Sequence, residues 1–152
     1  MSRWQRGQAS VGQLIADGEL ERVTGAAADG GPWLSKARRT LTTAASAADI
    51  DPDSSFTLAY DAARFACTAL LTQQGLRPTT RGGHYAVEVA VREQFSGKFS
   101  QFGALRRQRN DIEYPRIITA PLTKADADSA IGLAQELTEA AQQLLPHLGL
   151  FG

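Results

Sequence analysis

The sequence predicts an all-α domain, an antiparallel up-and-down bundle of about five helices. Apolar residues recur at helical spacing along most of the 152-residue chain. One long segment, roughly residues 55–74, is apolar around most of a helical circumference. Only one stretch alternates as a strand would, and no second convincing strand is present to pair with it.

The first predicted helix follows a polar segment. Residues 1–9 are expected to form a flexible N-terminal arm, and residues 10–152 a single domain. Ser10 is a suitable N-cap. The stretch VGQLIADGELERV (residues 11–23) then places on one helical face Val11, Leu14, Ile15 and, as a further candidate, Leu20. Glycines in the following TGAAADGG break this helix.

The next two helices are expected to form the centre of the domain. Pro32 suits the first turn of a helix over WLSKARRTLTTAASAA. In the helix at about residues 55–74 the polar residues fall on one narrow line, namely Thr57, Asp61, Arg64, Thr68 and Thr72. This polar line is expected to face solvent, a partner chain or a site. The single cysteine, Cys67, lies on the apolar side and is interpreted as a buried thiol.

The stretch HYAVEVAVREQF (residues 84–95) fits two patterns. Its valines alternate as in a strand, while Val87, Ala90, Val91 and Phe95 have helical spacing. We choose the helix because no partner strand is evident. On such a helix one line is shared, at intervals of four residues, by His84, Glu88 and Arg92.

Two further helices complete the prediction. Helical spacing from Phe99 onward continues into RRQRNDIEYP (residues 106–115), which must end near Tyr114 because Pro115 follows. PRIITAPL (residues 115–122) is a predicted connector. Thr123 can cap a long last helix that has Asp126 in its first turn.

Composition and short motifs exclude several classes of protein. The formal net charge is zero, which disfavours a broadly cationic nucleic-acid binder and leaves a local basic patch. One cysteine permits neither an intrachain disulfide nor a cysteine-rich metal site. No apolar run approaches the roughly 20 residues of a membrane span, and MSRWQRGQAS lacks a secretory core, so a cytoplasmic protein is expected. Phosphate-loop, nucleophile-elbow and H-E-x-x-H motifs are absent from the sequence.

The charged stretch RRQRNDIEYP is the main candidate site. On a helix, one line is formed by Phe102, Arg106, Arg109 and Glu113, with Asn110 beside it. Arginine presents a planar fork of donors that matches phosphate oxygens, so this line could bind phosphate. It could equally be a solvated face whose arginines pair with Asp111 or Glu113, and spacing alone leaves both interpretations open.

Other polar residues are weaker candidates. Asp61 and Arg64 could form a surface pair or belong to an interface or site. His84 could cap its helix or pair with Glu88, and no metal or cofactor is expected because no second histidine or cysteine lies nearby.

Three segments, taken in order, resemble the HEPN superfamily of small helical domains: FTLAYDAARFACTALLTQQGLRP, GGHYAVEVAVREQF and FGALRRQRNDIEYP. The resemblance covers about residues 10–145 and is greatest to compact bacterial members of toxin–antitoxin and defence systems. It implies an antiparallel helical bundle, usually a homodimer in which the motif helices meet at the two-fold axis. Active members of the superfamily are metal-independent endoribonucleases.

The nuclease motif of that superfamily is an arginine, four to six intervening residues and a histidine. Arg109 followed by Asn110 matches its beginning. No histidine falls in the window that follows Arg106, Arg107 or Arg109, and Tyr114 is one of the residues that stand there instead. Histidine suits proton transfer because its pKa lies near neutrality, whereas tyrosine is a poor base at pH 7.

The sequence therefore predicts a dimeric, non-catalytic component that contacts RNA or a nucleotide or binds a partner. The predicted contact or dimer-centre residues are Arg106, Arg109, Asn110, Asp61, Arg64 and His84. A cognate antitoxin or nucleotidyltransferase is the partner that the resemblance implies. One alternative is a metal-independent endoribonuclease in which Arg109 stabilises charge and protons pass through Glu113, Tyr114 or His84. A second alternative is a purely structural helical interaction protein.

Overall fold

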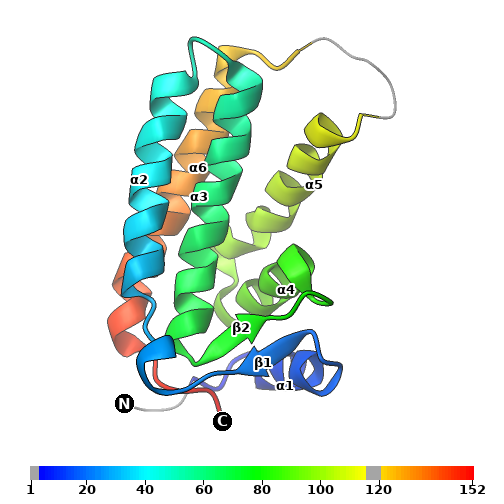
Figure 1. Ribbon diagram of the computed structural model, residues 1–152, viewed down its shortest axis with the longest axis vertical. Helices are drawn as coiled ribbons and strands as arrows, with labels where there is room; N and C mark the ends of the chain where they lie inside the picture. The colour runs from blue at the N-terminus through cyan, green and yellow to red at the C-terminus, as the bar shows by residue number, and fades with distance from the viewer. Residues whose placement is uncertain (1–3, 116–120) are drawn as a thin grey trace.

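The computed structural model describes residues 4–115 and 121–152, and this part of the chain is mainly helical (Figure 1). Its α-helices are α1 (Gln8–Ala16), α2 (Gly31–Ala47), α3 (Pro52–Gln73), α4 (Gly83–Phe95), α5 (Phe102–Glu113) and α6 (Lys124–Leu144). Its strands are β1 (Leu20–Arg22) and β2 (Leu76–Pro78). The predicted all-α fold is confirmed, with six helices in the described residues where about five were expected. None of these helices combines the length and the hydropathy needed to cross a membrane.

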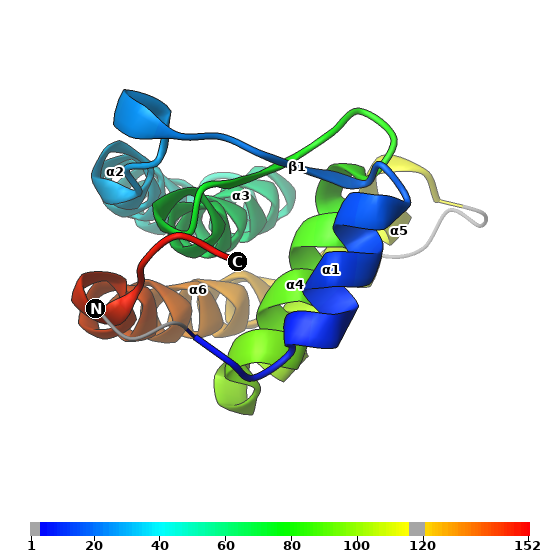
Figure 2. The same cartoon turned by 90° about the horizontal axis from the view of Figure 1, so that it is seen from below.

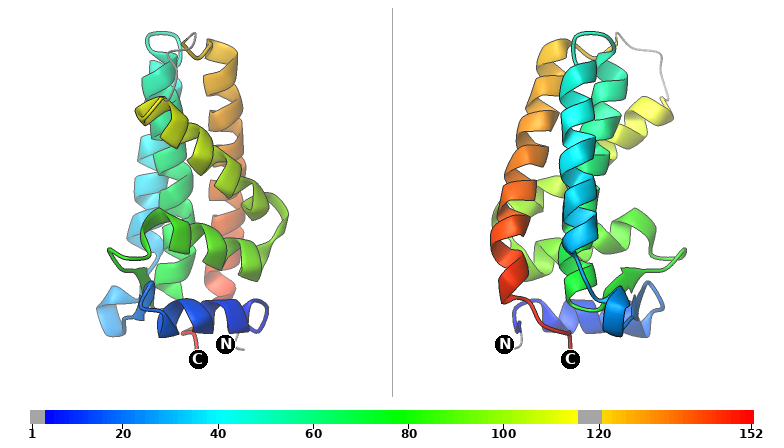
Figure 3. Two further views of the ribbon diagram at one scale, coloured as in Figure 1. Left: turned by 90° about the vertical axis from the view of Figure 1, so that its right-hand side faces the viewer. Right: turned by 60° about the vertical axis from the view of Figure 1, so that its left-hand side comes forward.

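The long helices run alternately up and down. α2 rises, α3 descends beside it, α5 rises at an angle on the outside, and α6 descends next to α3 (Figures 1 and 3). α4 lies across the lower part of the bundle, below α5 and against the lower end of α3 (Figure 1), and α1 lies beside α4 at the base (Figure 2). The side of the molecule bounded by α3, α4 and α5 is where the predicted site residues gather.

Helix α3 is the centre of the core, as its sequence predicts. It packs against both α2 and α6, and small residues in its interior face allow this close approach. Cys67 is fully buried, as expected, and burial raises the pKa of its thiol. The polar line of α3 does not face open solvent throughout its length, because Thr68 and Thr72 are both buried.

The segment after α1 differs from the prediction. α1 begins at Gln8 after Gly7, which has a φ of 72°, so Ser10 lies inside the helix and is not its cap. Val11 and Leu14 are buried on α1 as predicted, but Leu20, the further candidate for that helical face, lies in β1, which pairs antiparallel with β2 and places Leu20 opposite Pro78. Leu20 is nevertheless buried. Its burial was predictable from its apolar character, but its strand pairing depends on a partner far along the chain.

The later elements follow the prediction closely. Residues 83–95 form helix α4 and not a strand. α5 ends at Glu113, directly before Tyr114 and Pro115. Thr123 caps α6 in a capping box with Asp126. Of the predicted connector, residues 116–120 lie outside the described part of the chain.

Candidate functional site

Side chains from α3, α4 and α5 come together on one side of the bundle. α3 contributes Asp61 and Arg64, α4 contributes His84 and Glu88, and α5 contributes Arg106 and Arg109. We call these six residues the arginine cluster. Helical spacing explains the grouping, because Asp61 and Arg64 lie about one turn apart, as do Arg106 and Arg109. The fold thus unites residues that are separated by almost 50 positions in the sequence.

Arg106 is held by the buried carboxylate of Glu88. Its Nε donates to Glu88 Oε1 at 2.7 Å, and the Glu88 side chain is only 4% exposed. Arg92 approaches the other carboxylate oxygen at 3.4 Å. Gly103 on α5 makes this placement possible, since a Cβ there would lie 2.7 Å from the Glu88 carboxyl carbon. A buried charge is stable only when it is paired, so Glu88 and Arg106 are expected to depend on each other.

Arg109 and Arg64 are held more loosely. The guanidinium carbon of Arg109 lies 5.8 Å from the centre of the Tyr60 ring, a cation–π distance, and its Nη2 is 4.0 Å from Glu113. Arg64 lies 3.9 Å from Asp61, also beyond hydrogen-bonding distance. In both arginines the Nε is buried and has no hydrogen-bond partner among the described residues. These two guanidinium groups therefore retain donors that an anion could satisfy.

His84 joins the arginine cluster through Tyr60. The ring nitrogen Nδ1 lies 2.8 Å from the Tyr60 hydroxyl oxygen, within hydrogen-bonding distance. Tyr60 is fully buried and its ring stacks on Phe102 at 5.6 Å between centroids. His84 reaches solvent on one side, but partial burial and the charges of the nearby arginines lower its pKa to about 4. The imidazole is therefore neutral at pH 7, and it is a weaker base than a histidine whose pKa lies near neutrality.

The two other titratable groups here also have shifted pKa values. Burial raises the pKa of Tyr60, and the nearby arginines only partly oppose this effect, so its phenol stays protonated and can donate a hydrogen bond. Burial also raises the pKa of Asp61, which Arg64 and Arg109 counteract and Glu113 reinforces. Desolvation is the main cause of both shifts, in agreement with the partial burial of Arg64, Arg106 and Arg109, whose side chains are 22%, 19% and 24% exposed.

The sequence-predicted residues are only partly brought together. Asn110 accepts a 3.4 Å contact from its neighbour Arg109, and Glu113 lies at the edge, 4.0 Å from Arg109. Tyr114 is 77% exposed just beyond the end of α5. The suggested pairing of His84 with Glu88 is not what the structure contains, since Glu88 contacts Arg92 and Arg106 and the histidine contacts Tyr60.

Sequence reasoning missed two important residues. Tyr60 lies in the segment that was predicted as a mainly apolar helix and was not singled out, although a buried tyrosine hydroxyl usually needs a hydrogen-bond partner and thus indicates a nearby polar group. Gly103 gave no signal, because its importance depends on the approach of Glu88 from another helix.

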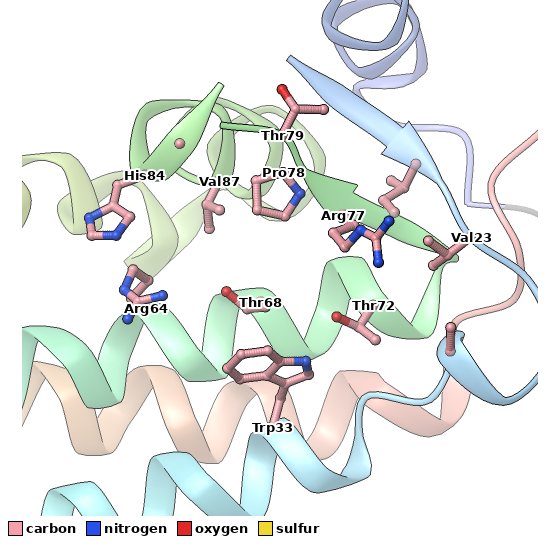
Figure 4. A pocket seen from close by; sticks show the side chains of 13 residues that line it. Val23, Trp33, Arg64, Thr68, Thr72, Arg77, Pro78, Thr79, His84 and Val87 are labelled. Atoms are coloured by element: carbon pink, nitrogen blue, oxygen red, sulfur yellow. The ribbon is translucent and has the colours of Figure 1, made fainter. Parts of the chain in front are cut away.

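A cavity of about 340 Å³ adjoins the arginine cluster (Figure 4). Arg64 and His84 belong to both, and in the close view they lie together at one end of the cavity. The opposite end lies near Arg77 and Val23. The described residues include no group of three or more histidine, cysteine, aspartate or glutamate side chains placed to bind a metal ion.

Comparison with known proteins identifies the family. The HEPN domain matches residues 32–144, a range that runs from the second residue of α2 to the end of α6 and includes every residue of the arginine cluster. Searches of curated proteins and of solved structures each return no match. A match over this much of the chain agrees with the six-helix fold and with the resemblance seen in the sequence, and the chain belongs to the HEPN domain family.

Proposed function

We propose that this HEPN domain binds the phosphate groups of RNA or of a nucleotide chiefly through Arg64 and Arg109, with Arg106 beside them but paired to Glu88, and that it acts as a non-catalytic, homodimeric component of a toxin–antitoxin or defence system. The observation that carries the binding proposal is that Arg64 and Arg109 are loosely held: their side chains are 22% and 24% exposed, and they lie 3.9 Å and 4.0 Å from their acidic neighbours. A phosphate would give these guanidinium groups a closely paired acceptor. The pKa of His84 is lowered mainly by burial, and the charges of Arg64, Arg109 and Arg106 lower it further, so the three guanidinium groups lie close enough to act together on one site.

The number of arginines limits how strongly salt should affect binding. Each phosphate neutralised on a single strand contributes about 0.7 to the slope of log affinity against log salt. Two or three arginine–phosphate contacts thus predict a slope of about −1.4 to −2.1. This is shallow compared with proteins that bind nucleic acid over a broad cationic surface, and it agrees with a chain whose net charge is zero.

Fluorescence anisotropy with a labelled single-stranded RNA at several salt concentrations tests the proposal. Arg64→Gln and Arg109→Gln should each weaken binding and reduce the slope by about 0.7. Arg107→Gln is the matched control, because Arg107 is on α5 but exposed and outside the arginine cluster. If Arg107→Gln weakens binding as much as Arg109→Gln does, general charge and not the arginine cluster is responsible, and the proposal is wrong.

A metal-independent endoribonuclease is the second candidate, and His84 is the observation that favours it. Its neutral ring lies in the arginine cluster although it is far from RRQRNDIEYP in sequence. When Nδ1 carries the proton and donates to the Tyr60 oxygen, Nε2 is unprotonated and can take a proton from an RNA 2′-hydroxyl. That hydroxyl oxygen would attack the adjacent phosphorus to form a 2′,3′-cyclic phosphate as the bond from phosphorus to the 5′-oxygen of the next nucleotide breaks. The protonated His84 would return its proton, directly or through water, to the departing 5′-oxygen, and Arg109 would stabilise the negative charge.

RNA cleavage in EDTA separates the two candidates. For a nuclease, His84→Gln should abolish cleavage while RNA binding persists, and Arg109→Gln should impair both. For a non-catalytic component, wild-type protein should bind RNA without cleaving it. If neither binding nor cleavage occurs and both variants still dimerise, the chain is better described as a structural interaction module. Size-exclusion chromatography with light scattering checks the proposed homodimer in the same samples.

A further inference from the structure

The cavity beside the arginine cluster has the size and position of a ligand site. It lies between α2, α3, β2 and the start of α4 (Figure 4). Its volume of about 340 Å³ is within the range of about 300–1,000 Å³ typical of small-molecule sites. It is continuous with the arginine cluster through Arg64 and His84, which line one end.

Most of the cavity wall is apolar and includes an aromatic ring. Trp33 from α2 lies on one side, while Pro78 and Val87 lie on the other (Figure 4). Leu76 from β2 completes this apolar lining. An apolar wall with an indole suits a flat ring system better than a strongly hydrated ligand, because aromatic side chains stack on flat rings.

Two hydroxyl groups on α3 interrupt the apolar wall. Thr68 and Thr72 are four residues apart and therefore adjacent on the helix surface, and their hydroxyl oxygens are directed upward from α3 toward the cavity in the close view (Figure 4). Thr68 is only 6% exposed, and its hydroxyl has no hydrogen-bond partner among the described residues. By contrast, the buried hydroxyl of Thr138 donates to the Ala134 carbonyl at 2.7 Å. The Thr68 hydroxyl is thus free to bind the polar edge of a ligand.

The end of the cavity near the arginine cluster is positively charged. Arg64 lines the cavity, and its buried Nε also has no partner among the described residues. A ligand that satisfies all these features has a flat ring with hydrogen-bonding groups at its edge and an anion attached to it. A nucleotide has this chemistry, whereas an aliphatic acid would leave the two threonine hydroxyls unused.

We propose that this cavity binds the base of a nucleotide, free or within single-stranded RNA, whose phosphate lies on Arg64 and Arg109. This inference rests on the proposed phosphate-binding function and adds a base-binding subsite to it. Stacking on an aromatic side chain favours each bound base by about 5- to 150-fold in affinity. A nucleoside monophosphate should therefore bind at least about fivefold more tightly than ribose 5-phosphate, which has the phosphate but no base.

Titration calorimetry with the four nucleoside monophosphates and with ribose 5-phosphate tests the inference. Thr68→Val retains the shape of the side chain but removes the hydroxyl, and should weaken the best-bound nucleotide by about 2- to 10-fold. It should leave ribose 5-phosphate binding unchanged. Thr57→Val is the matched control, since Thr57 is on the same polar line of α3 but does not line this cavity.

A spectroscopic measurement locates the bound base independently. The chain has two tryptophans, and only Trp33 lines the cavity. Trp4 donates from its indole nitrogen to the Gln94 carbonyl at 3.0 Å and serves as an internal reference. Nucleotide should shift the Trp33 indole resonance in NMR spectra and leave that of Trp4 in place.

The outcomes separate the two proposals. If ribose 5-phosphate and all four nucleotides bind equally, in an Arg109-dependent manner, the base-binding inference is wrong and phosphate binding stands. If a nucleotide shifts Trp33 and binds equally well to Arg109→Gln, the cavity binds a base but the arginine cluster does not bind its phosphate. If no nucleotide binds and the Trp33 resonance does not move, the base-binding inference is wrong. The fluorescence anisotropy titrations with RNA then test the phosphate-binding proposal separately.

Discussion

Replacing Glu88 with glutamine tests how the arginine cluster is held in place. The glutamine keeps the shape of the side chain but removes its charge. In the wild type, the Glu88 carboxylate is 4% exposed and accepts a 2.7 Å hydrogen bond from Arg106. Hydrogen bonds to charged groups contribute about 1.5–3 kcal/mol, so we expect Glu88→Gln to lower the free energy of unfolding by about 2 kcal/mol. For a chain of this length, that loss corresponds to a decrease in Tm of about 4–8 °C.

The same substitution should affect ligand binding in the opposite direction. Without the carboxylate, Arg106 no longer has a counter-charge at 2.7 Å and can contact a phosphate instead. Glu88→Gln should therefore bind single-stranded RNA more tightly than the wild type at low salt, with a salt slope steeper by about 0.7. Thermal melts followed by circular dichroism and anisotropy titrations measure the two effects on the same protein.

Glu93→Gln is the matched control for this prediction. Glu93 is the next acidic residue of α4, its side chain is 42% exposed, and it contacts Arg92 at 3.5 Å. An exposed pair of this kind contributes about 0–1 kcal/mol. If Glu88→Gln unfolds at the wild-type temperature, or if the two variants lose equal stability, the reasoning that a buried carboxylate positions Arg106 is refuted.

Three further predictions concern packing, capping and protonation. Gly103→Ala should destabilise the fold by about 1–3 kcal/mol, because the new Cβ would press on the Glu88 carboxylate. Gly132→Ala should stabilise the fold by about 0.4–1 kcal/mol, because a Cβ at this position of α6 would meet no neighbouring atom within 4 Å. Urea titrations measure both changes. Thr123→Ala should cost about 1 kcal/mol through loss of the α6 cap, and Thr123→Ser should retain most of it. His84 should titrate near pH 4 by NMR, so its contribution to stability is present above its ordinary pKa of 6.5 and is lost as the pH falls from 6.5 toward 4. Bound phosphate should raise this pKa, and an ordinary value in the free protein would show that His84 is not in the arginine cluster.

Much of the fold was predictable because helical periodicity is a local signal. The wide apolar surface of α3 identified the central helix, and Thr123 with Asp126 identified the start of α6. The strand pair was not predictable, since each strand has three residues and its partner lies more than 50 positions away. At that length, alternation carries almost no information, and pairing is decided by how the chain returns to the base of the bundle.

The arginine cluster was likewise predictable only in part: the spacing within each helix could be read from the sequence, but the contacts between helices could not. Spacing alone placed Arg106 and Arg109 on one side of α5 and predicted the polar line of α3. Spacing could not show that α4 packs against both α3 and α5. It therefore could not predict the contact of His84 with Tyr60 or of Glu88 with Arg106. Those contacts depend on the angles between helices, which are set by packing of the whole core and not by any short motif.

The pairing of β1 with β2 has a consequence for how this domain could be transplanted. The family match begins at residue 32, yet Leu20 of β1 is 1% exposed, and Val23 and Ala27 line the cavity beside the arginine cluster. At the other end, Leu148 is also 1% exposed and lies beyond the match. A chimaera that inherited only residues 32–144 would receive all three arginines of the arginine cluster, but it would lack α1, β1 and the cavity-lining residues Val23 and Ala27. The segment that must be transferred to keep this fold is therefore longer than residues 32–144, which the family match covers.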